Sequence, residues 1–322
     1  MLKIYYTPFD NVVNAYTHRM KSILSNYGEV HRIDKHSIMK KIFKFNFNDI
    51  IVVNWLENMM INKEGNISLI GLVKLFAIFI CFRMIFRRFI YVRHNHYPHS
   101  CNLKSSKSAK KILDFLEKIP HMTLVHSQVE AIGSRQYIPH PLYDIPSKSS
   151  TTNLDSKKFV IFGSISRYKK IENVIEKFPE NLSLLVIGGC SDADYLNYLN
   201  NLKKDKKNIE IIPEYVSDEK AQELINSARG MLITHNDDDM IVSGSFFYAM
   251  SIQAKTYVLE TPFFNWVSQE LGERHIKVSS NLEQMFSNII YEPVLINVNN
   301  GKYPEDLFSD EIIISKFGQL LN

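Results

Sequence analysis

Short apolar strands alternate with helical patterns along nearly the whole of this 322-residue chain. Apolar runs of strand length are followed by segments whose apolar residues recur three or four positions apart, which is the rhythm of βαβ units. Such units build parallel sheets with helices on both faces. In the first half we expect strands at Leu2–Tyr6, Ile50–Asn54, Phe89–Val92 and Thr123–Val125, and helices at Asn14–Asn26 and Lys107–Glu117.

The alternation stops once, at the polar residues 146–158, and then begins again. We therefore expect an α/β protein with two doubly wound, Rossmann-like domains facing a cleft at the carboxyl ends of their strands. We assign residues 1–147 to the first domain, 148–158 to a linker and 159–322 to the second domain, with the last helix a candidate to pack back on the first. In the second domain the expected strands are Phe159–Phe162, Leu182–Ile187, Ile209–Ile212, Met231–Thr234 and Thr256–Leu259, and the helices are Ile171–Phe178, Ala193–Leu202, Asp218–Ser227 and Ser245–Ile252.

Composition indicates a globular protein from a reducing compartment. Hydrophobic residues make up 45% of the chain and charged residues 22%, without a long disordered tract. The three cysteines, Cys81, Cys101 and Cys190, lie far apart without C-x-x-C spacing, so we expect no structural zinc. The first ten residues lack the apolar region of a signal peptide, and we expect a cytoplasmic protein.

The two halves carry opposite charge. Residues 1–150 contain 21 Lys and Arg against 10 Asp and Glu, which gives +11, whereas residues 151–322 contain 17 against 24, which gives −7. A basic first half suits an anionic surface, either nucleic acid or the inner leaflet of a membrane. The cations are not interleaved with an aromatic platform and the acidic half would repel a phosphate backbone, so nucleic acid is the weaker candidate.

Residues 67–88 form a second unusual segment. Only the eight residues from Leu75 to Phe82 run uncharged between Lys74 and Arg83, which is too short for a spanning helix. One interpretation is a helix in the membrane interface, with Lys74, Arg83, Arg87 and Arg88 on lipid headgroups. The alternative is a helix packed between the sheet and solvent.

Two turns in the second half combine phosphate-binding features. Gly163 ends a strand, and Arg167, Lys169 and Lys170 come directly before a helical pattern. Cations alone are disfavoured at a helix N-terminus, so a bound anion would explain them; the alternative is a solvated basic turn.

The second turn contains Ser243, Gly244 and Ser245, which open a helix. Their N–H groups and hydroxyls could bind phosphate oxygens, and Gly244 lets the backbone approach a ligand closely. The alternative is an ordinary Ser N-cap on a core helix.

Taken together, these segments resemble the GT-B glycosyltransferases, specifically the bacterial family-4-like and related capsule or O-antigen enzymes. In that family a G-x(3)-R-x-K-like turn grips the donor diphosphate, and here it corresponds to Gly163, Arg167 and Lys169. Residues 231–251 correspond to the segment that receives the donor. Further similar segments are residues 5–20, 54–57, 93–99, 125–127 and 138–143.

The same resemblance implies a nucleobase site at Pro213–Ser217, where Tyr215 could stack on the base and the Val216 backbone could bind its edge. The acidic run Asp237–Asp239 is interpreted as a solvated loop, with Asp239 nearest the donor sugar. Retaining family-4 enzymes carry two glutamates about eight residues apart, where this chain has Met240 and Tyr248. This departure favours an inverting or divergent enzyme.

An inverting transfer needs a base for the acceptor hydroxyl. His94 follows a strand directly and has a suitable unperturbed pKa, so it ranks first, ahead of Asp10 and Glu57. The alternative is that His94 and His99 only bond backbone groups near the cleft. A metal site is disfavoured because His94 and His96 alternate in an extended segment and no Cys or carboxylate lies near.

The sequence therefore predicts a glycosyltransferase that moves a sugar from a nucleotide-diphosphate donor to a lipid-linked saccharide. We expect it on the inner face of a bacterial membrane, in capsule, exopolysaccharide or O-antigen assembly. No metal is required in this account, because two cations and a helix dipole can offset the charge of the departing diphosphate. The alternatives are a catalytically inactive GT-B-like subunit that binds a partner and, less favoured, a nucleic-acid-binding protein.

Overall fold

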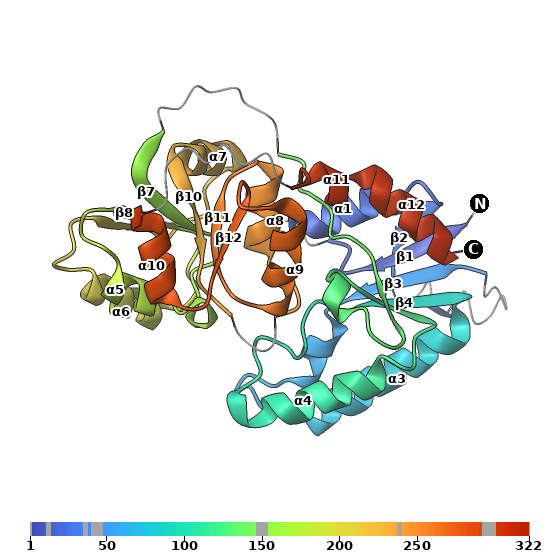
Figure 1. The fold of residues 1–322 in the computed structure, drawn as a ribbon. Helices are drawn as coiled ribbons and strands as arrows, with labels where there is room; N and C mark the ends of the chain where they lie inside the picture. Colours follow the sequence, from blue (N-terminus) through green and yellow to red (C-terminus); the bar gives the residue numbers. More distant parts are fainter. Residues whose placement is uncertain are drawn as a thin grey trace. The chain divides into compact units, whose positions relative to one another are not determined.

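A computed structural model describes residues 2–10, 14–34, 38–39, 48–145, 154–236, 240–291 and 301–321. These residues form two compact units (Figure 1). The first unit contains the described residues up to 141, residues 240–242 and the C-terminal residues from Phe308 onward. The second contains the described residues between 142 and 307 apart from that short insertion.

The first unit is built on a six-stranded parallel sheet in the order β2-β1-β3-β4-β5-β6. Its strands are β1 (Lys3–Thr7), β2 (Glu29–Arg32), β3 (Ile50–Asn54), β4 (Arg88–Val92), β5 (Met122–Val125) and β6 (Arg135–Tyr137). Its helices are α1 (Ala15–Leu24), η1 (Leu56–Met60), α3 (Leu69–Ile85), α4 (Leu103–Leu116), η2 (Gln128–Glu130) and α12 (Asp310–Leu321). The central strands β3 and β4 are buried on both faces, as expected for a sheet covered by helices.

The second unit repeats this plan with a six-stranded parallel sheet in the order β12-β11-β10-β7-β8-β9. Its strands are β7 (Asp155–Phe162), β8 (Ser183–Ile187), β9 (Ile209–Ile212), β10 (Ala228–Ile233), β11 (Thr256–Leu259) and β12 (Ile276–Ser279). Its helices are η3 (Arg167–Lys169), α5 (Ile171–Lys177), α6 (Ala193–Leu202), α7 (Asp218–Asn226), α8 (Gly244–Ser251), α9 (Pro262–Leu271), α10 (Leu282–Tyr291) and α11 (Glu305–Phe308).

Two parallel Rossmann-like sheets confirm the predicted α/β class, but strand limits differ where the sequence is polar. β7 begins at Asp155, so its first residues lie within the linker predicted over 148–158. Those residues alternate between exposed and half-buried and pair with β10 from Ala228, which an apolar-run criterion does not detect. The strands β2, β6 and β12 were not predicted because edge strands need no continuous apolar run.

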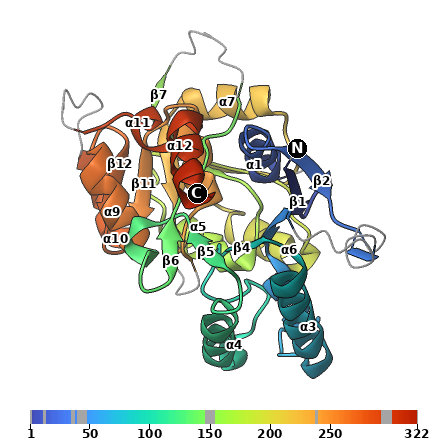
Figure 2. The same ribbon diagram turned by 90° about the vertical axis from the view of Figure 1, so that its right-hand side faces the viewer.

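Helix α3 is anchored on the first unit by one apolar face. Ser68 begins the helix by accepting a hydrogen bond from the Gly71 N–H. Leu75, Phe79 and Phe82 then pack into the core that covers β3 and β4. Figure 2 shows α3 and α4 projecting from the same end of the first unit.

The contact between α3 and η1 requires a glycine. A Cβ atom built on Gly71 would lie 2.1 Å from the carbonyl oxygen of Met59 in η1. This is far inside van der Waals contact, and the obstacle is backbone rather than a flexible side chain.

We expect Gly71→Ala to lower the free energy of unfolding by about 1–3 kcal/mol, because the helix must move away from η1. Helix propensity alone predicts the opposite sign, a gain of about 1 kcal/mol. Denaturant unfolding of the two proteins distinguishes the two effects, with Lys74→Ala on the exposed side of the same helix as the control. An unchanged or increased stability of Gly71→Ala would show that the close contact does not constrain α3.

Candidate active site

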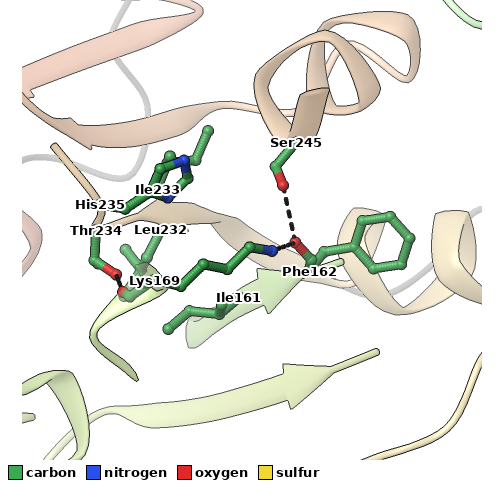
Figure 3. A pocket seen from close by; sticks show the side chains of 8 residues that line it. All are labelled: Ile161, Phe162, Lys169, Leu232, Ile233, Thr234, His235 and Ser245. Carbon is green, nitrogen blue, oxygen red and sulfur yellow. Dashed lines mark hydrogen bonds between the residues drawn. The ribbon is translucent and has the colours of Figure 1, made fainter. Parts of the chain in front are cut away.

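A pocket opens at the carboxyl ends of β7 and β10 in the second unit (Figure 3). This is the edge at which parallel α/β sheets bind ligands. The residues that line it are Ile161, Phe162, Lys169, Leu232, Ile233, Thr234, His235 and Ser245. They include one predicted donor-binding residue from each of the two turns, Lys169 and Ser245.

Gly163 leaves a space between a cation and a hydroxyl. The Lys169 ammonium and the Ser245 hydroxyl both donate to the carbonyl oxygen of Phe162, at 3.2 and 3.1 Å (Figure 3). A Cβ atom on Gly163 would lie 3.0 Å from the Lys169 Nζ and 3.3 Å from the Ser245 Oγ. Gly163 also has a φ of 101°, which L side chains rarely adopt. Because glycine has no side chain, a ligand atom beside Gly163 could contact both the Lys169 ammonium and the Ser245 hydroxyl.

The Lys169 ammonium is buried without a carboxylate. The residue is only 4% exposed, and it forms no ion pair with the described part of the chain. Burial lowers the pKa of Lys169 to about 8, because water no longer solvates the charged form. An anion bound here would replace the lost hydration and stabilise the charged form.

The N-terminus of α8 lies beside this cation. Ser243 acts as the N-cap, and its hydroxyl accepts from the Phe246 N–H at 3.4 Å. The capping role that was the alternative interpretation of Ser243 is therefore present. The N–H groups of Gly244 and Ser245 belong to the first helical turn, whose N–H groups have no partner within the helix. They supply donors and a partial positive charge next to Lys169.

Arg167 does not line this pocket. Its Nε donates to the Asp192 carboxylate at 2.7 Å, and its guanidinium lies 4.9 Å from the centre of the Tyr195 ring. Asp192 is the N-cap of α6, so it comes from a different element than Arg167. The Arg167 side chain is more than half exposed, and an ion pair of this kind is weak.

The predicted nucleobase segment lies between β9 and α7. The Tyr215 ring rests against the backbone of Gly189, where an added Cβ would lie 2.3 Å from a ring carbon. Tyr215 is nevertheless 76% exposed, so one ring face is open to solvent, and Val216 beside it is half-buried. An open aromatic face supported from behind is suited to stacking on a base.

Tyr248 is the residue that the resemblance to retaining family-4 enzymes sets against their second glutamate. Its ring centroid lies 4.4 Å from that of Phe162, and its hydroxyl donates to Asp218 at 3.5 Å. Tyr248 is thus packed beside the end of β7 and supplies a phenol in place of a carboxylate. Met240 belongs to the first unit and forms a bridge with Asn95.

The sequence interpretation missed His235 and Thr234 as pocket residues. Thr234 donates its hydroxyl to the Lys169 carbonyl at 3.2 Å, which fixes the backbone of the η3 turn. The buried His235 packs edge-on against Tyr168, with ring centroids 5.4 Å apart. Both residues directly follow the end of β10, and this position in the sequence could have identified them as pocket residues.

In the first unit, His94 is held at the carboxyl edge of the sheet. Its Nε2 lies 2.9 Å from the Asn54 Oδ1, and its ring stacks on Trp55 with centroids 4.2 Å apart. The Asn54 amide is oriented because its Nδ2 donates to the Thr7 carbonyl at 3.1 Å. Since Oδ1 can only accept, Nε2 carries the proton and Nδ1 carries the lone pair. Burial and the neighbouring histidines lower the pKa of His94 and favour the neutral ring, whose basic atom is then Nδ1.

Two further buried histidines surround this site. The Tyr16 hydroxyl lies 2.8 Å from the His126 Nε2, and the His126 Nδ1 donates to the Ile138 carbonyl at 3.0 Å. The rings of His94 and His140 lie 5.3 and 5.2 Å from that of His126. Burial lowers the pKa of His126 to about 4, and burial together with neighbouring histidines lowers the pKa of His94 and His140 well below 6.5.

The other two base candidates differ sharply in environment. Asp10 is exposed and forms an ion pair with Arg32 at 2.9 Å. Glu57 belongs to η1 and is buried, with Tyr91 donating to its Oε2 at 3.0 Å and its Oε1 without a partner among the described residues. Burial raises the pKa of Glu57 to about 7. Only His94 is both oriented by a neighbour and located directly past a central strand.

The cations predicted to face a membrane lie on or next to α3. Lys74, Arg83 and Arg87 are exposed, whereas Arg88 is half-buried as the first residue of β4. In the part of the chain that the structure describes, no helix is long and apolar enough to cross a membrane. Within the same residues no group of three metal-ligating side chains gathers, and Asp237–Asp239, including the predicted donor residue Asp239, lie outside them.

We expect acid to destabilise the first unit through its buried histidines. Since the pKa of His126 is about 4 in the folded protein and 6.5 is its ordinary value, the stability from this residue is complete above pH 6.5. It is lost as the pH falls from 6.5 toward 4, by about 3 kcal/mol at most. Thermal unfolding at pH 7 and pH 5 measures the effect. His126→Gln should flatten the pH dependence and the exposed His18→Gln should not; equal slopes in all three proteins would contradict the assignment.

Comparison with solved structures identifies proteins of the same fold. HepE (Alr3699) from Anabaena, in complex with UDP and glucose, aligns with a TM-score of 0.69 over 100% of this chain and 99% of its own, at 12% identity. Sucrose-phosphate synthase from Thermosynechococcus elongatus gives 0.67 over 100% and 98%, at 10% identity. AviGT4, a glycosyltransferase involved in avilamycin A biosynthesis, gives 0.59 over 99% and 96%, at 11% identity. No protein-family model and no curated protein sequence matches the chain. The chain therefore has the GT-B fold that its sequence predicts.

Proposed function

We propose that this protein is a glycosyltransferase that binds a nucleotide-diphosphate sugar in its second unit. The observation that carries the proposal is the space beside Gly163, which the Lys169 ammonium and the Ser245 hydroxyl both adjoin. A buried cation without a carboxylate, next to the N-terminus of a helix, is suited to a diphosphate. HepE has been crystallised with UDP, and we take UDP as the first donor nucleotide to test.

The remaining donor contacts follow from this position. Tyr215 offers an open ring face to the base, and the Val216 backbone is beside it. Arg167 reaches the diphosphate in this account by exchanging its exposed contact with Asp192 for a phosphate oxygen. We propose that no metal is required, because Lys169, Arg167 and the helix terminus together offset the charge of the leaving group.

We propose an inverting transfer with His94 as the base. The acceptor hydroxyl gives its proton to the His94 Nδ1 while its oxygen forms a bond to the anomeric carbon. The bond from that carbon to the diphosphate oxygen breaks with its electron pair, and the nucleoside diphosphate leaves. The lowered pKa of His94 keeps Nδ1 unprotonated at neutral pH, and it also makes Nδ1 a weaker base.

For the acceptor we propose a lipid-linked saccharide, as in bacterial capsule, exopolysaccharide or O-antigen assembly, at the inner face of the membrane. The support is the charge of the first half of the chain, in which Lys and Arg outnumber Asp and Glu by 21 to 10 up to residue 150. An excess of this size suits a lipid diphosphate carrier and an anionic bilayer.

Lys169→Met should weaken UDP binding by about 10- to 100-fold, because it removes a charge-assisted hydrogen bond from a buried site. Arg167→Ala should weaken binding less, since Arg167 is exposed and must first leave Asp192. Calorimetric titration without added metal measures both, with Lys220→Met on the surface of α7 as the control. Unchanged affinity in Lys169→Met would remove the donor-site assignment, and GDP, CMP and dTDP are titrated alongside to identify the base.

His94→Gln should lower the transfer rate by about 100- to 10,000-fold while leaving UDP affinity unchanged, because the base acts on the acceptor. In the assay, the protein receives a labelled nucleotide sugar together with bacterial membranes. The label that is then extracted into organic solvent measures transfer, and His18→Gln is the control. Wild-type protein that binds nucleotide but transfers no sugar would favour the inactive, partner-binding alternative. Equal rates for wild type and His94→Gln would dismiss His94 as the base.

A further inference from the structure

Helix α3 carries large apolar side chains on its outer face as well as on its inner one. Its exposed members follow helical spacing and include Leu69, Ile70 and Met84, which are 74%, 70% and 73% exposed. Val73 and Ile80 lie between them on the same face and are at least half exposed. We call these five residues the α3 stripe. A helix on the surface of a soluble domain normally presents polar residues to water, so a continuous apolar stripe indicates an interaction surface.

The surroundings of the stripe are predominantly basic. Residues 65–113, which include all of α3 and α4 as far as Leu113, contain nine Lys and Arg and no Asp or Glu. The one acidic residue of α4, Asp114, is paired with Arg93 and Arg135. The neighbouring helix α4 carries four exposed lysines, Lys104, Lys107, Lys110 and Lys111. None of the four forms an ion pair with a described residue. These lysines therefore remain available to an anionic partner.

Helices α3 and α4 lie side by side in the first unit (Figures 1 and 2). The rings of Phe76 in α3 and Phe115 in α4 are 5.9 Å apart, and Phe115 is itself more than half exposed. Leu103, the first residue of α4, is 88% exposed. The pair of helices thus combines exposed apolar side chains with unpaired cations over one end of the unit.

We infer that this pair of helices docks on an anionic lipid bilayer. The α3 stripe enters the boundary between headgroups and acyl chains, and the cations of α3 and α4 contact the lipid phosphates. Helix α3 has 17 residues and its inner face is committed to the core, so it lies in the interface rather than crossing the membrane. A lipid surface accounts for both features at once, because it offers apolar chains beneath a continuous layer of negative charge.

The inference deepens the proposed action on a lipid-linked acceptor and rests on it for its biological purpose, but its test needs no transfer reaction. Sedimentation with vesicles of phosphatidylcholine and phosphatidylglycerol measures binding, and pure phosphatidylcholine vesicles test the role of charge. We expect strong binding to the anionic vesicles that weakens with salt, and little binding to the neutral ones.

Two sets of variants separate the apolar and electrostatic parts. Ile70→Ser, Val73→Ser and Met84→Ser combined should weaken vesicle binding by about tenfold or more. Lys107→Glu with Lys111→Glu should weaken it by at least about 25-fold, since each cation at the surface contributes roughly fivefold. Lys204→Glu with Lys207→Glu, exposed in the second unit, makes the same charge change and is the matched control.

UDP titration of the same variants shows whether they are folded and keeps this inference separate from the proposed function. Stripe variants that bind UDP normally but no longer sediment with vesicles would support the docking surface. Sedimentation equal to that of wild type would overturn it. A wild-type dimer that the serine substitutions convert to a monomer would also overturn it, because the stripe would then be an interface between copies of the chain.

Discussion

The donor-site account depends on a lysine that is buried without a carboxylate. Burial and the adjacent N-terminus of α8 both oppose the charged form of Lys169, whose ammonium is held by the Phe162 carbonyl. A carbonyl supplies only a partial charge, so this arrangement leaves the cation under-compensated. A diphosphate would offset both the burial of the ammonium and the positive end of the helix, since it pairs with the ammonium and accepts hydrogen bonds from the helix N–H groups. Glycine at position 163 suits this arrangement, because its φ of 101° disfavours other residues and an added Cβ would lie 3.0 Å from the Lys169 Nζ.

The sequence predicted the parts of the fold that depend on local patterns. Buried parallel strands are continuous apolar runs, and β3, β4 and β10 were located for that reason. The turns that end β7 and open α8 were recognised because glycine, serine and lysine interrupt the apolar pattern there. The start of β7 was not recognised, because Asp155 and the lysines after it form a strand only through pairing with β10.

Contacts between distant residues were beyond sequence reasoning. Arg167 was predicted to bind phosphate. Its ion pair with Asp192, the N-cap of α6, joins residues 25 positions apart in the sequence and was not predicted. The support that Gly189 gives to Tyr215 depends on close packing of two strand ends. His94 was selected for its place after a strand, whereas the residues that orient it, Asn54 and Trp55, come from the end of another strand. Their roles follow from the parallel sheet, which brings strand ends together.

The most direct measurement is a crystal structure of the protein with UDP. The account predicts the diphosphate within hydrogen-bond distance of the Lys169 Nζ and the N–H groups of Gly244 and Ser245, with the uracil on the exposed face of Tyr215. Displacement of the Phe162 carbonyl as the partner of Lys169 should accompany it. A nucleotide bound elsewhere on the protein, with the space beside Gly163 empty, would contradict the central claim.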